Sequence, residues 1–129
     1  MKYVIDSYAW LAYFMGTKEG ENAKTIIDSS EEKITPTICL AEVYGKTLKV
    51  EGEETAEKQR IFIKEKSALA PLDELIALEA ARTSNKMKKE IEGWGLADSI
   101  VYATGVVKKA EVVTGEEHFK KLEGVLFIK

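Results

Sequence analysis

Short apolar segments alternate with longer amphipathic segments along the chain, and this alternation restricts the fold more than any other feature. Residues 2–5 (KYVI) end in consecutive apolar residues, which is typical of a strand covered on both faces of a parallel sheet. The predicted strands are residues 2–5, 31–35, 68–72, 110–115 and 124–129. The predicted helices are residues 7–16, 18–30, 36–50, 53–67, 73–89 and a loop-led segment at 92–109, with a shorter turn at 116–122. Strands that alternate with helices predict an α/β fold, with helices on both faces of a central parallel sheet of about five strands.

Composition limits the classes of protein that fit this chain. Its 129 residues suit a single domain spanning 1–129. The net charge of −3 gives no global attraction to nucleic acid, so any binding of nucleic acid would need local basic patches. Cys39 and His118 are the single cysteine and the single histidine, which excludes an intrachain disulfide and cysteine- or histidine-rich metal sites. No apolar run approaches the length of about 20 residues that spans a bilayer. The chain is therefore expected to be cytoplasmic and not membrane-bound.

Four acidic residues stand where an α/β fold binds ligands. Asp6 follows the first predicted strand and Glu116 follows the fourth, so both are expected at the rim formed by the carboxyl ends of the strands. Glu42 lies on the helix 36–50, and Asp98 lies at the start of the helix within 92–109. If the fold brings these acids together, their repulsion favours a bound divalent cation, for which Mg²⁺ and Mn²⁺ are the natural oxygen-seeking choices.

Each acid also has a purely structural interpretation. Asp6 and Asp98 are both placed to cap the helix that follows them, and Glu116 could complement a helix dipole. Glu42 falls opposite a predicted apolar arc, which favours a solvated position. That arc consists of Leu40, Val43, Tyr44 and Leu48. The spacing alone leaves these alternatives open.

Buried faces are predicted for two other helices. Trp10, Tyr13 and Phe14 recur at helical spacing and are expected to pack in the core. The helix 73–89 is strongly amphipathic, and its stripe is placed on Leu75, Leu78, Ala81 and Arg82.

The stretches around the four acids resemble a known family. Four stretches resemble, in their order along the chain, the acidic motifs of PIN-domain proteins, and most closely those of the small toxins of VapBC toxin–antitoxin pairs. They are YVIDSYAWL, CLAEVYGK, GLADSIVYA and VVTGEEHF. The resemblance implies a three-layer α/β/α sandwich and an endoribonuclease that depends on Mg²⁺ or Mn²⁺. By this analogy Asp6, Glu42 and Asp98 are the core catalytic metal ligands, and Glu116 completes the site. RNA substrate, an antitoxin protein and a homodimer are the implied partners.

The resemblance extends to polar neighbours of the acids, with one departure. Ser7 matches a small hydroxyl residue that supports the first ligand or the scissile phosphate, and Thr114 matches a polar member of the rim. Lys46, one helical turn after Glu42, is the candidate phosphate contact. The family usually has aspartate at the position of Glu116, and the longer side chain here puts a second metal in question. Glu117 is an alternative ligand in a less favourable direction.

Other residues near the motifs have two interpretations each. Trp94, between two glycines, could stack on a base or anchor its loop, and the anchor is preferred. His118 could contact RNA or position Glu116, but a helix-surface or partly packed position is preferred.

The hypothesis is hydrolysis of single-stranded or loop RNA by metal-activated water, with a carboxylate accepting the proton. A phosphoacceptor receiver domain would need a second acid near the first strand, and a haloacid-type phosphatase would need aspartate where Tyr8 stands. The alternative that remains open is a catalytically weak or inactive PIN-like domain that binds RNA or protein.

Overall fold

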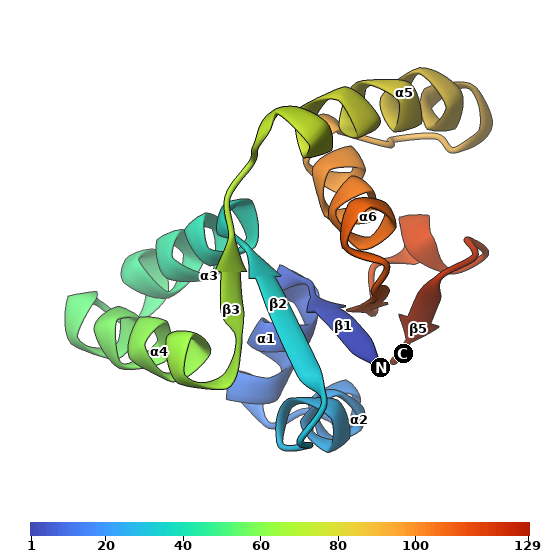
Figure 1. Cartoon of the computed structure of the whole chain (residues 1–129). Helices are drawn as coiled ribbons and strands as arrows, with labels where there is room; N and C mark the ends of the chain where they lie inside the picture. The colour runs from blue at the N-terminus through green and yellow to red at the C-terminus, as the bar shows by residue number, and fades with distance from the viewer.

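The computed structural model describes residues 1–129 as a five-stranded, fully parallel sheet flanked by helices (Figure 1). The strands are β1 (Lys2–Ile5), β2 (Glu32–Pro36), β3 (Ala68–Ala70), β4 (Glu111–Thr114) and β5 (Val125–Phe127). The α-helices are α1 (Ser7–Met15), α2 (Lys18–Ile27), α3 (Thr37–Val50), α4 (Glu53–Lys66), α5 (Glu74–Glu90) and α6 (Leu96–Lys108), with a short 3₁₀ helix, η1 (Glu117–Phe119). The predicted α/β class and the α/β/α arrangement are confirmed.

The sheet lies between two layers of helices. Along β1, Tyr3 and Ile5 face one core, which they share with Trp10 of α1 and side chains of α2, α3 and α4. Val4 faces the opposite core, together with Val101 of α6 and Met87 of α5. Since successive residues of a strand point to opposite faces, consecutive apolar residues in β1 serve both layers at once. The strand pattern in the sequence therefore reflects a sheet that is covered on both sides.

The buried faces of two helices differ from the prediction, completely on α5 and in part on α3. On α5 the buried side chains include Ile76 and Ala80, whereas Leu75 is 67% exposed and Leu78 is 49% exposed, so the predicted stripe is wrong. On α3 the predicted arc is confirmed in part: Val43 is buried, and Leu40 and Tyr44 are half-buried, but Leu48 is exposed. The helix also buries Cys39 and Thr47. Trp10 is fully buried as predicted, with Tyr13 and Phe14 partly buried against the same core.

The first two helices form a closely packed pair. Gly16 ends α1 in the left-handed conformation, with φ of 69°, and its N–H caps the helix. Gly20 of α2 then lies so close to α1 that a Cβ atom there would overlap the carbonyl oxygen of Ala12. This contact fixes α1, whose first residues follow directly from β1, against the rest of the layer.

The order of the strands places the candidate site. The sheet runs β3-β2-β1-β4-β5, so the chain continues outward on one side of β1 as far as β3 and then returns to the other side at β4. In open parallel sheets, ligands bind outside the carboxyl ends of the two strands that flank this switch. Here those strands are β1 and β4, which precede Asp6 and Glu116. None of the helices has the length and apolar character needed to cross a membrane.

Candidate metal centre

Asp6 is the most deeply buried acid of the site, at 6% exposure. It is the N-cap of α1, and its Oδ1 accepts a hydrogen bond from the Ser7 N–H at 2.8 Å. Oδ2 accepts from the Thr114 hydroxyl at 2.7 Å, so the residue after β1 is tied to the end of β4. The cap and the ligand interpretations do not conflict, because a carboxylate has lone pairs for about four partners and the cap occupies one.

Glu42 reaches the same place from α3. Its Oε1 accepts a hydrogen bond from the Ser7 hydroxyl at 3.0 Å, so Ser7 connects the two acids through its backbone N–H and its side chain. Glu42 is an exposed residue, as its position opposite the apolar arc predicted, but the solvent that it faces is a pocket at the switch point. A solvated helix face and a cleft wall are the same surface here.

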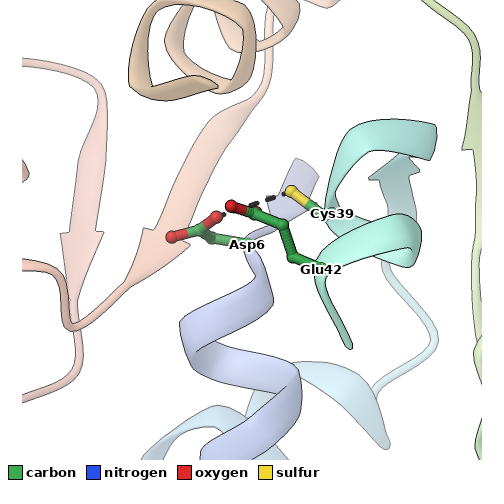
Figure 2. Close-up of side chains that lie close together, drawn as sticks. All are labelled: Asp6, Cys39 and Glu42. Atoms are coloured by element: carbon green, nitrogen blue, oxygen red, sulfur yellow. Dashed lines mark hydrogen bonds between the residues drawn. The ribbon is translucent and has the colours of Figure 1, made fainter. Parts of the chain in front are cut away.

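Cys39 is part of this cluster and was not predicted. Ligand atoms of Asp6, Cys39 and Glu42 all lie within 4.8 Å of one another, with Cys39 and Glu42 on successive turns of α3 (Figure 2). The Cys39 thiol is buried and donates to Asp6 Oδ1 at 3.5 Å. The signal in the sequence was the spacing of three between Cys39 and Glu42, which places both side chains on one helix face.

Asp98 and Glu116 line the same pocket but lie outside the ligand-spaced cluster. The pocket has a volume of about 180 Å³ and is lined by Asp6, Ser7, Tyr8, Leu11, Glu42, Ala97, Asp98, Val101 and Glu116. The prediction that Asp98 caps the helix after it is wrong in position, because α6 already begins at Leu96 and its N-cap is Gly95. Asp98 is the third residue of α6, and its Oδ2 accepts the N–H of this N-cap residue at 3.1 Å. The same oxygen lies 3.0 Å from Nδ1 of His118. Four acids from distant parts of the chain therefore share one pocket.

The pocket is electrostatically costly without a cation. Burial raises the pKa of Asp6, and the nearby Asp98 carboxylate raises it further, while the hydrogen bonds from Thr114, Ser7 and Cys39 oppose this shift. The pKa of Glu42 is also raised, first by burial and then by Asp6 and Asp98. Burial and the neighbouring Asp6 raise the pKa of the Cys39 thiol well above its usual value. Negative charge thus accumulates with no basic side chain among the lining residues.

The donor set fits a hard divalent cation. Asp6 and Glu42 offer carboxylate oxygens at ligand spacing, and Asp98 and Glu116 offer further oxygens across the pocket. The Cys39 thiol stays protonated and serves Asp6 as a hydrogen-bond donor, which suits an oxygen-seeking ion better than a thiophilic one.

The other predicted residues occupy different positions. Thr114 is fully buried, and its hydroxyl also accepts the Glu116 N–H at 3.0 Å. Lys46 is exposed in a separate groove that meets the acidic pocket at Leu11. Glu117 pairs with Lys129 at 3.0 Å and does not line the pocket.

Trp94 is an anchor and not an exposed stacking surface. It is 5% exposed, and its Nε1 donates to the Ser99 hydroxyl at 2.7 Å, which confirms the preferred interpretation. A larger cavity, of about 560 Å³, lies at the opposite end of the strands around Lys2, Glu111 and Gly124. That cavity lacks a cluster of ligand-spaced acids, so the chemistry indicates the smaller pocket as the functional one.

The comparison with family models agrees with this geometry. The model of the PIN domain matches residues 3–125, which is nearly the whole chain. The chain belongs to the PIN domain family. The four acidic motifs that suggested the resemblance all lie within the matched residues of this PIN domain.

Solved structures have the same fold as this PIN domain at low sequence identity. A toxin–antitoxin complex from Klebsiella pneumoniae aligns with a TM-score of 0.79 and 18% identity, covering 98% of each chain. VapBC2 from Rickettsia felis, bound to a DNA fragment from its promoter, aligns at 0.78 and 13% identity, covering 98% of this chain and 97% of the other. VapC20 from Mycobacterium tuberculosis, a sarcin–ricin loop cleaving toxin, aligns with a TM-score of 0.75 and 13% identity, covering 94% of this chain and 95% of the other. No curated protein sequence matches the chain significantly.

Proposed function

We propose that this PIN domain is an endoribonuclease that depends on Mg²⁺ or Mn²⁺ and hydrolyses RNA phosphodiester bonds, with residues 1–129 acting as one domain. The observation that carries this proposal is the convergence of Asp6 and Glu42 at ligand spacing in a pocket that Asp98 and Glu116 also line. PIN domains are generally nucleases, and one structural neighbour is a toxin that cleaves the sarcin–ricin loop.

The charge of the pocket supports metal dependence. A phosphodiester carries a negative charge, and the pocket presents several carboxylates and no basic side chain, so RNA alone would be repelled. A divalent ion, when bound by these acids, supplies the Lewis acidity that polarises the phosphate and lowers the pKa of a water molecule.

The protein groups have distinct roles in this proposal. Asp6 and Glu42 bind the ion, with Asp98 as a third ligand directly or through water. Ser7 orients both Asp6 and Glu42 through its N–H and hydroxyl. Thr114, buried behind Asp6, holds that carboxylate instead of contacting RNA. Glu116, which lies outside the cluster, accepts the proton of the attacking water at its carboxylate.

The chain is further proposed to be the toxin of a VapBC-type pair that acts in the cytoplasm as a homodimer, silenced by an antitoxin. Structural neighbours crystallised as toxin–antitoxin complexes support the antitoxin. Three exposed leucines, Leu72 just before α5 and Leu75 and Leu78 in its first turns, are the proposed apolar surface for self-association. Lys46, which lines the groove next to the pocket, is proposed to contact a phosphate that flanks the scissile bond.

The test is cleavage of a labelled RNA with single-stranded loops in Mn²⁺ or Mg²⁺. We expect cleavage by the wild type, none in EDTA, and loss to background in Asp6→Asn and Glu42→Gln. Glu117→Gln is the matched control, because this acid neighbours the site in sequence but pairs with Lys129 outside the pocket. Equal cleavage by Asp6→Asn and the wild type would refute the proposal.

A second candidate is a PIN-like domain that binds RNA or protein with weak or no catalysis. It is favoured by the position of Asp98 outside the ligand-spaced cluster and by the longer side chain of Glu116. Metal binding without RNA cleavage under any divalent ion would support this candidate. Cleavage lost in Asp6→Asn would exclude it.

A further inference from the structure

His118 is the only histidine of the chain, and it contacts two acids of the pocket. It lies on η1, directly after β4, with its Nδ1 at 3.0 Å from Asp98 Oδ2 and 3.8 Å from Glu116 Oε1. These contacts connect the loop after β4 to the start of α6, two segments that the sheet does not otherwise join. The sequence offered a contact with RNA or an effect on Glu116 for this residue and favoured a helix-surface or partly packed position. The ring is partly packed, and its shorter contact is to Asp98.

The hydrogen bonds of Asp98 are unequally divided between its two oxygens. Oδ2 accepts both the Gly95 N–H and the His118 Nδ1–H, because a carboxylate has no proton to give and Nδ1 must be the donor. Oδ1 has no partner within the chain. Two donors on one oxygen fix the rotation of the carboxylate and leave the other oxygen available to a ligand in the pocket that Asp98 lines.

The imidazole ring is itself fixed by its surroundings. Its Nε2 lies against Gly93, where an added Cβ would come within 3.2 Å, and Gly93 has a positive φ of 80°. The ring centroid is 6.3 Å from that of Trp94, which is buried and hydrogen-bonded to Ser99 on α6. The ring is therefore held in one position between the loop 93–95 and the carboxylates of Asp98 and Glu116, unlike a histidine on a solvated helix face.

We infer that His118 is a positioning residue, which holds Asp98 so that its free oxygen completes the metal site. Groups that hydrogen-bond to metal ligands set the orientation and the affinity of those ligands, and their loss typically weakens metal binding about 10- to 100-fold. This inference depends on the proposed metal site and assigns no contact between His118 and the ion or the RNA.

The first experiment measures Mn²⁺ affinity by isothermal titration calorimetry. His118→Leu removes the donor at similar size, and we expect its affinity to fall about 10- to 100-fold. His118→Asn places an amide N–H close to the position of Nδ1 and is expected to remain within about threefold of the wild type. Rescue by asparagine separates donation to Asp98 from a packing role, and it can be measured even if the leucine variant folds poorly.

The second experiment tests whether the effect passes through Asp98. In an Asp98→Asn background, His118→Leu is expected to cause no further loss of Mn²⁺ affinity. The amide oxygen of asparagine would accept the two N–H donors there, so the group left on the pocket side is an NH₂, which is not a metal ligand. A full additional loss in the double variant, or wild-type affinity in His118→Leu alone, overturns the inference. Absence of Mn²⁺ binding by the wild type would instead refute the proposed metal site, so the two failures are distinguishable.

Discussion

Replacing Thr114 by valine removes one hydroxyl and leaves the shape of the side chain nearly unchanged. That hydroxyl donates to Asp6 Oδ2 at 2.7 Å and accepts the Glu116 N–H at 3.0 Å, and the side chain is fully buried. A hydrogen bond to a charged group contributes about 1.5–3 kcal/mol, and an unsatisfied N–H costs about 1 kcal/mol or more. We therefore expect Thr114→Val to destabilise the fold by about 2.5–4 kcal/mol.

The matched control is Thr114→Ser, which keeps the hydroxyl and loses one methyl group, at a cost of about 1 kcal/mol. Unfolding entropy of about 2.1 cal/mol/K per residue makes 1 kcal/mol equivalent to about 4 °C in Tm for a chain of 129 residues. The expected decreases in Tm are thus about 10–15 °C for valine and about 4 °C for serine, measured by circular dichroism in EDTA.

Metal affinity gives a second measurement on the variants Thr114→Val and Thr114→Ser. The hydrogen bond from Thr114 lowers the pKa of Asp6 against the effect of burial, so its loss favours the protonated acid. Thr114→Val should then bind Mn²⁺ more weakly than Thr114→Ser at neutral pH. The reasoning is refuted if valine is as stable as serine at position 114, or if the two variants bind Mn²⁺ equally.

Two further predictions follow from the packing and the charge of the site. Gly20→Ala should destabilise the protein by about 2–3 kcal/mol, because the added Cβ would overlap the carbonyl oxygen of Ala12. Gly45 is exposed in the middle of a helix, so Gly45→Ala should stabilise the protein by up to about 1 kcal/mol. Urea unfolding of both variants checks that the two changes in stability have opposite signs. Because burial raises the pKa of Asp6, the folded chain retains this proton where the unfolded chain has lost it, so the contribution of Asp6 to stability falls as pH rises above about 4. In EDTA, Asp6→Asn should therefore gain stability relative to the wild type as the pH rises above about 4, and a pH-independent difference would contradict this.

The helix faces illustrate where sequence patterns are insufficient. On α5 the leucines at 75 and 78 and the buried residues Ile76 and Ala80 both recur at helical spacing, so the sequence offers two apolar stripes. Periodicity identifies the helix, but the direction in which the helix packs against α6 decides which stripe is buried. The same holds for α3, where packing against α4 buries the polar residue Thr47 and its hydroxyl donates to Gln59 of α4 at 2.6 Å.

Some features of the candidate site could likewise be predicted from the sequence, and others could not. The positions of Asp6 and Glu116 at one rim followed from the alternation of strands and helices, because parallel strands all end at the same edge. The participation of Cys39 and the contact between His118 and Asp98 did not follow, since each of these single residues acquires its contacts from neighbours on other elements.

The sequence by itself determined the α/β class, the acids at the carboxyl edge of the sheet and the PIN family, because these depend on local periodicity and on motif order. The tertiary structure alone decided which side chains meet: that Thr114 and Cys39 hold Asp6, that Ser7 connects Asp6 to Glu42, and that Asp98 stands apart beside His118. The physical reason is that hydrogen bonds between residues far apart in the chain depend on packing angles between layers, which no local pattern specifies.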